Sequence, residues 1–151
     1  MKGILKWPLI IAAVVVVLRV VVERSGAPDV AANLLSVVAL HFLIGPVYFA
    51  IRIAMSGEPR PYSTYIKTIA IYVVLTRAMV LPTYWLARIY GWQQNRFGGL
   101  ATADTFTAYF KIPFATAAAW IIASVIFGGV LGSALIAITR RIAGKPAAAR
   151  G

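Results

Sequence analysis

The stretch IPFATAAAWIIASVIFGGVLGSALIAI, which runs from Ile112 to Ile138, contains no charged residue. A helix of about 20 mainly apolar residues crosses the hydrocarbon core of a bilayer, and a longer helix tilts. In lipid every backbone polar group must be satisfied internally, which a helix achieves within a single segment. The sequence therefore predicts a membrane-spanning helix over 112–138.

Three further segments have the same apolar character, namely 4–22, 30–51 and 65–89. The second is uncharged throughout, and the third contains Arg77. A β-barrel would instead alternate apolar and polar residues in short segments. We therefore expect an all-α integral membrane bundle of four transmembrane helices. It forms one domain over 1–139, followed by a basic, frayed tail over 140–151.

The composition excludes a soluble globular protein. Of the 151 residues, 61% are hydrophobic and 13% are charged, whereas soluble proteins have roughly 45–50% apolar and about 25% charged residues. Disordered chains have low hydrophobicity, so disorder is excluded as well. The absence of cysteine excludes disulfide frameworks and thiolate metal sites, and four acidic residues leave little material for carboxylate chemistry.

Lysine and arginine are distributed unevenly over the predicted loops. Nine lie on the side of the membrane that holds both termini, and four lie on the other side, or five if Arg19 snorkels toward it. Because cytoplasmic loops are enriched in these residues, we expect both termini in the cytoplasm and the protein in the inner (plasma) membrane. The net charge of +11 then faces a bilayer with anionic headgroups. No nucleic-acid partner is expected, because the basic residues flank the spans.

The connection between the third and fourth spans carries two local signals. Asp104 precedes a short run rich in aromatic residues and is placed to cap a short helix. Pro113 suits the first turn of the fourth span, where a missing N–H is not needed.

Arg77 is the strongest candidate for a functional residue, because it lies near the middle of the third predicted span. An arginine at that depth costs from about 2.5 kcal/mol upward and usually faces protein or water. No predicted span contains an aspartate or glutamate, so no salt bridge within the chain is available at that depth. Two interpretations stay open. Either Arg77 snorkels along its helix to a lipid phosphate, or it contacts a ligand or a partner.

An internal resemblance links the second and third spans. HFLIGPVYFAIRI (41–53) and RAMVLPTYWLARI (77–89) share a basic first residue, a proline, a tyrosine followed by an aromatic residue, and a late arginine. The two helices are predicted to be antiparallel neighbours, which places His41 and Arg77 at similar depth. Coincidence is the simpler interpretation, because aromatic residues and a terminal arginine end many spans.

The spacing of the two matching segments groups four residues. Tyr48 shares a helix face with His41, and Tyr84 shares a face with Arg77. We hypothesise that His41, Tyr48, Arg77 and Tyr84 form a ligand or partner contact. An anionic headgroup, a ligand, or a carboxylate from a partner subunit would complete that site.

His41 is the single histidine of the chain, so metal sites built from several histidines are not expected. One imidazole can still ligate a haem or a chlorophyll axially, or hydrogen-bond a quinone. The more frequent role of a histidine inside a span is a hydrogen bond to a neighbouring helix. No cofactor is required by the sequence.

The fourth span contains a stripe of small residues. Ser124, Gly128 and Gly132 repeat every four residues, and small residues at this spacing let helix backbones approach closely. We therefore predict tight helix packing along this stripe, either within the chain or against another subunit.

No catalytic constellation is present, because the chain has no P-loop, no GxSxG, no HExxH and no paired carboxylates on one helix face. We therefore expect a protein that is not an enzyme. The leading prediction is a small, non-catalytic accessory subunit of a larger membrane protein complex. One alternative is an oligomeric carrier or channel for an anionic or lipid-like molecule. A further alternative is a subunit that contacts haem, chlorophyll or quinone through His41.

Overall fold

The computed structural model describes residues 2–143, and these residues form helices and connections without a strand. Four helical segments are long and apolar enough to cross a membrane. The prediction of an all-α, four-helix membrane bundle is therefore confirmed. The four segments are Gly3–Arg24, Val30–Ala54, Pro61–Ile89 and Thr107–Ile142.

The first span is the single helix α1 (Lys2–Arg24), whereas the second span is built from several pieces. These pieces are α2 (Asp29–Leu34), α3 (Val37–Ala39), the π-helical turn η1 (Leu40–Ile44) and α4 (Gly45–Ala54). The break falls at Ser36, whose backbone is extended and whose side chain accepts a hydrogen bond from the Val38 N–H at 3.2 Å. A serine hydroxyl that caps a new helix start competes with helix continuation.

The third span is α5 (Pro61–Ile89), and its first turn contains Pro61, where a missing N–H has no cost. The fourth span is α6 (Ile112–Ala143), which continues the π-helical turn η3 (Thr107–Lys111). Residues 140–143 thus belong to a helix, and the prediction that the frayed tail begins at 140 is wrong for them. The rest of the predicted tail, 144–151, lies outside the described residues.

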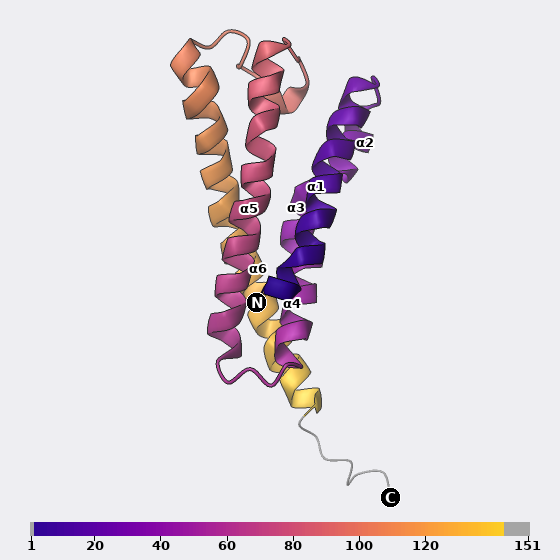
Figure 1. Cartoon of the computed structure of the whole chain (residues 1–151), viewed down its shortest axis with the longest axis vertical. Coiled ribbons are helices and arrows are strands. Elements are labelled where there is room, and N and C mark those ends of the chain that lie inside the picture. The colour runs from indigo at the N-terminus through magenta and orange to yellow at the C-terminus, as the bar shows by residue number, and fades with distance from the viewer. Residues whose placement is uncertain (1, 144–151) are drawn as a thin grey trace, which may run out of the picture.

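The helices are arranged as two halves (Figure 1). α5 and α6 run side by side in one half, and α1 lies along α2–α4 in the other. The α1–α2 turn and the α5–α6 connection lie at the same end of the bundle, which we call the loop end. The halves meet toward the opposite end, where α4 packs against α5 and α6, and they diverge toward the loop end.

The small-residue stripe of α6 faces α4 and α5 of the same chain. A Cβ atom placed on Gly128 would lie 3.2 Å from the Pro46 Cγ atom, and one placed on Gly132 would overlap the Tyr65 ring. The Tyr65 hydroxyl donates a hydrogen bond of 2.5 Å to the Gly128 carbonyl. The third member, Ser124, is fully buried. The partner of the stripe in this structure is therefore intrachain.

The α5–α6 connection is anchored by Arg88 near the end of α5. Its guanidinium donates to the carbonyls of Leu100 and Ala101, each at 2.7 Å. The carboxylate of Asp104 accepts a hydrogen bond from the Thr107 N–H at 3.0 Å, which confirms the predicted cap. This connection also contains the short 3-10 turn η2 (Asn95–Phe97), which brings Arg96 over the space between the two halves.

Candidate anion-binding cavity

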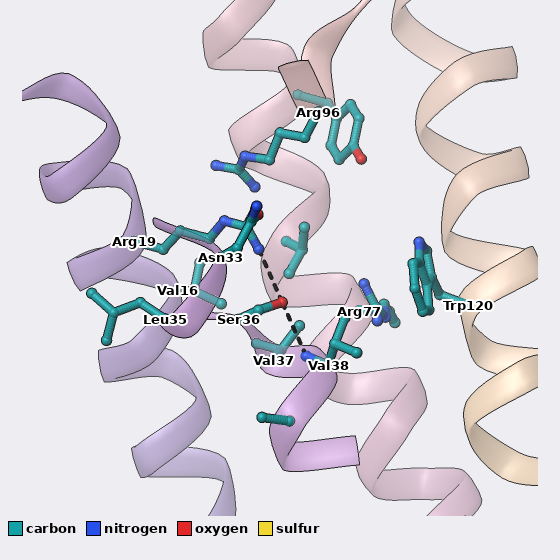
Figure 2. A pocket seen from close by; sticks show the side chains of 13 residues that line it. Val16, Arg19, Asn33, Leu35, Ser36, Val37, Val38, Arg77, Arg96 and Trp120 are labelled. Atoms are coloured by element: carbon teal, nitrogen blue, oxygen red, sulfur yellow. Dashed lines mark hydrogen bonds between the residues drawn. The ribbon is translucent and has the colours of Figure 1, made fainter. Parts of the chain in front are cut away.

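A cavity of about 500 Å³ lies between α1, the α2–α3 break, α5 and α6 (Figure 2). Its volume is within the range of roughly 300–1,000 Å³ found for small-molecule sites. The charged side chains that line it are Arg19 from α1, Arg77 from α5 and Arg96 from η2. We call it the arginine cavity. Figure 2 shows Arg77 between α3 and Trp120, with Arg96 nearer the loop end.

Arg77 is buried, with 7% of its surface exposed. Its Nη2 atom lies 3.4 Å from the His41 Nδ1 atom, and its Cζ atom lies 5.1 Å from the centre of the Trp120 ring. The Nε atom is buried and has no hydrogen-bond partner. Residues 2–143 contain two ion pairs between side chains. Both pairs involve Glu23, and neither includes Arg77. The guanidinium therefore keeps an uncompensated charge and a free donor.

His41 has no exposed surface, and both of its ring nitrogens have partners. Its Nε2 atom lies 2.5 Å from the Thr76 hydroxyl, and that hydroxyl is within 3.0 Å of two carbonyls of its own helix. Because the hydroxyl proton goes to a carbonyl, the hydroxyl oxygen accepts from Nε2–H. Nδ1 is then the acceptor that receives Arg77 and the Ser124 hydroxyl, which lies at 3.3 Å. The hydrogen bonds thus assign a neutral imidazole with its lone pair turned toward Arg77.

The π-helical turn η1 places His41 against α5. Gly45, directly after this turn, donates its N–H to the carbonyl of Leu40, five residues earlier. A Cβ atom on Gly45 would lie 2.7 Å from that carbonyl and 3.0 Å from the Tyr72 ring, so this position excludes a side chain. The Tyr72 ring in turn packs edge-on against His41 at 5.7 Å. Pro46, which has no N–H to donate, follows the turn.

Glu23 joins the other two arginines of the cavity. Its carboxylate accepts from Arg19 at 2.9 Å and from Arg96 at 2.7 Å, and it is 8% exposed. Burial lowers the pKa of the Arg96 guanidinium from its ordinary value, and the nearby Glu23 carboxylate partly offsets that effect. Arg19 also donates to the Ser36 hydroxyl at 3.0 Å, so it ties α1 to the break in the second span.

The charges around the cavity do not balance. Arginine stays protonated in proteins, so Arg19, Arg77 and Arg96 bring three positive charges, and Glu23 brings one negative charge. Two positive charges are left without a counter-charge from the described side chains. Charges removed from water are costly unless they are paired. The cavity is therefore suited to an anion.

The structure brings together three of the four residues of the predicted contact. His41 and Arg77 are in contact, so the prediction of neighbouring helices with these residues at similar depth is confirmed. Tyr84 lines the cavity beside Arg77, with 7% of its surface exposed. Tyr48 lies elsewhere, next to Phe49 and along a small apolar cavity. Each residue turns a helix by about 100°, so the wider η1 turn moves Tyr48 off the face of His41.

Sequence reasoning did not identify Arg19, Glu23 or Arg96 as members of the site. The i,i+4 spacing of Arg19 and Glu23 was a usable signal, because residues at that spacing meet on one helix face. Arg96 offered no such signal, since it lies in a connection whose path depends on the folded loop. Trp120, which covers the Arg77 guanidinium, looked like one more apolar residue of the fourth span.

The observed contacts leave no open ligand position at His41. Axial ligation of haem or chlorophyll needs a ring nitrogen that faces free space, and both nitrogens are engaged by side chains in a fully buried environment. The chemistry of this region therefore centres on Arg77.

Comparison of the chain with protein-family models, with curated proteins and with solved structures finds no match.

Proposed function

We propose that the protein is a non-catalytic integral membrane protein that binds an anionic, lipid-like molecule in the arginine cavity. The observation that supports this most strongly is Arg77, which is buried beside the cavity with a free Nε donor and without a carboxylate partner. An arginine that only snorkelled would extend toward the membrane surface. Arg77 is instead held inside the bundle by His41 and Trp120.

The surroundings of the cavity support a lipid-like ligand. Asn33 and Ala39 line it from the second span and Trp120 lines it from α6, and all three are exposed at the surface of the bundle. These exposed lining residues lie on the second span and on α6, and we infer that a ligand reaches the cavity between these two helices, from the hydrocarbon of the bilayer. A ligand with an apolar tail can enter by this route without crossing the loop end.

The same exposed lining residues support a second candidate function, that of an accessory subunit of a larger complex. A carboxylate on a partner helix could enter between α3 and α6 and pair with Arg77. Purification from the native membrane distinguishes the two functions. A stoichiometric membrane protein partner supports the accessory subunit, whereas a bound anionic lipid without a partner supports lipid binding.

The experiment that tests the proposal compares wild-type protein with Arg77→Leu. Lipids that stay bound through detergent purification are extracted and identified by mass spectrometry. We expect wild-type protein to retain an anionic lipid and Arg77→Leu to lose it. Arg141→Gln removes an exposed charge outside the cavity and serves as the matched control. Equal lipid retention by all three proteins, with unchanged or higher thermal stability of Arg77→Leu, would show that Arg77 does not hold a ligand.

A further inference from the structure

The charge of the cavity points to the charge of its ligand. The three arginines and Glu23 leave two positive charges uncompensated among the described side chains. A carboxylate or a phosphate diester would balance only one of them. A dianionic group balances both, and a phosphate monoester carries about −1.5 to −2 charges at pH 7.

We propose that the arginine cavity holds the phosphate monoester headgroup of a lipid, a headgroup of the phosphatidic acid type. This inference rests on the proposed function and specifies the ligand class. A phosphate monoester offers three strong acceptor oxygens. A guanidinium presents a planar fork of N–H donors that matches phosphate geometry, and such charge-assisted hydrogen bonds are about twice as strong as neutral ones.

Arg77 is the anchor for this headgroup because its donors are available. Of its five N–H groups, the hydrogen bonds within residues 2–143 use only one, from Nη2 to His41. Arg19 already donates to Glu23 and Ser36, and Arg96 donates to Glu23 through two nitrogens. These two arginines therefore contribute mainly positive charge, while Arg77 contributes both charge and free donors.

The depth of the cavity indicates that the phosphate is membrane-borne. Arg77 lies about twelve residues before the end of α5, or roughly 18 Å from it at helical rise, and Arg19 lies roughly 8 Å from the end of α1. At the loop end, the ion pairs among Arg19, Glu23 and Arg96 bridge α1 and the α5–α6 connection. A free phosphate that came from the loop end would have to pass this network, whereas a lipid would reach Arg77 between the second span and α6.

The test measures lipid binding by the full-length protein in nanodiscs and by native mass spectrometry. The probes are dioleoyl phosphatidic acid, dioleoyl phosphatidylglycerol, dioleoyl phosphatidylcholine and inorganic phosphate. We expect phosphatidic acid to bind at least about tenfold more tightly than phosphatidylglycerol, a difference of about 1.4 kcal/mol. Below about pH 6 the monoester loses its second charge. The preference should then decline while phosphatidylglycerol binding stays constant.

Two substitutions connect this preference to the cavity. Arg77→Gln should abolish the preference for phosphatidic acid, and Arg77→Lys should retain part of it, because lysine keeps the charge but not the planar fork. Arg141→Gln is the control and should behave as wild-type protein. If Arg77→Gln does not fold, the pH dependence of the wild-type protein still tests the proposal without any variant.

The possible outcomes have different meanings. Equal binding of phosphatidic acid and phosphatidylglycerol at Arg77 would overturn the monoester assignment and leave the anionic-lipid function standing. If inorganic phosphate binds as tightly as phosphatidic acid, the proposal that the bound phosphate belongs to a lipid is wrong. Binding of neither anionic lipid would contradict the proposed function itself.

Discussion

Arg77 and His41 come from different spans, and each determines what the other can do. The imidazole accepts from the guanidinium and donates to Thr76, so it fixes Nη2 at the α5–second-span contact, while the buried Nε atom has no partner among the described residues. His41 is therefore a positioning residue for Arg77. A positively charged imidazole would turn a second N–H toward the guanidinium and could not accept from it.

At the residue scale, we predict that His41→Phe destabilises the bundle by about 1 kcal/mol, since interhelical hydrogen bonds in membranes average about 0.6 and reach about 1.7 kcal/mol. The variant should also weaken the retention of the anionic lipid, because Arg77 loses the partner that orients it. Unfolding in mixed micelles and lipid extraction measure the two effects. Tyr48→Phe, a change away from the arginine cavity, is the control for lipid retention. Full lipid retention by His41→Phe would contradict the positioning role.

At the element scale, two prolines occur in the same local structure, just beyond a π-helical turn. Pro46 follows the π-helical turn η1, and Pro113 follows the π-helical turn η3; both prolines are almost fully buried. A proline within a helix has no N–H and its ring clashes with the carbonyl four residues earlier. Each of these two prolines stands two residues after a π-helical turn, in which a backbone hydrogen bond spans five residues instead of four. At η1 this turn also presents His41 to α5.

The packing of α6 against α5 gives a prediction for the small-residue stripe. Gly132→Ala should destabilise the protein by about 1–3 kcal/mol, because the new methyl group would overlap the Tyr65 ring in a packed interface. Thermal unfolding in detergent measures the effect. Gly129→Ala is the matched control, since its Cβ would meet only the terminal Cδ1 atom of the Ile66 side chain, at 3.1 Å. Equal stability of the two variants would contradict the packing described for α6.

The start of the short helical segment at Asp104 gives a pH prediction. Hydrogen bonds from Thr107 lower the pKa of the Asp104 carboxyl from its ordinary value. The stability that this cap contributes is therefore present above the unfolded-state pKa of about 3.9 and is lost as the pH falls through the folded-state pKa. Protection of the Thr107 amide from hydrogen exchange, corrected for intrinsic rates, should decline in this acidic range. In Asp104→Asn the decline should be absent, and a decline of the same size would contradict the prediction.

At the scale of the whole molecule, the four spans place both termini on one side of the membrane. The excess of lysine and arginine on that side predicts that it is the cytoplasmic side. With that orientation, the loop end and the mouth of the arginine cavity lie in the outer half of the bilayer. A headgroup bound at Arg77 would then be drawn from the outer leaflet toward the middle of the membrane.

Single cysteines test this orientation, because the chain has none of its own. An impermeant maleimide added to intact cells should label Ala101→Cys, in the exposed α5–α6 connection. It should label Ser63→Cys, at the exposed start of α5, only after the cells are broken. Labelling of Ser63→Cys alone in intact cells would reverse the topology and place the arginine cavity in the inner half.

The amino-acid sequence by itself determines the fold class and the number of spans. A long apolar run in lipid must form a helix to satisfy its own backbone hydrogen bonds, whatever its neighbours are. It also determines the Asp104 cap and the shared depth of His41 and Arg77, since both follow from local spacing. Only the tertiary structure reveals the arginine cavity and the exclusion of Tyr48 from it. These depend on how a π-helical turn rotates one helix face and on where a folded loop places Arg96 against Glu23. Periodicity reports which residues share a face, but the face that meets another helix is decided by packing.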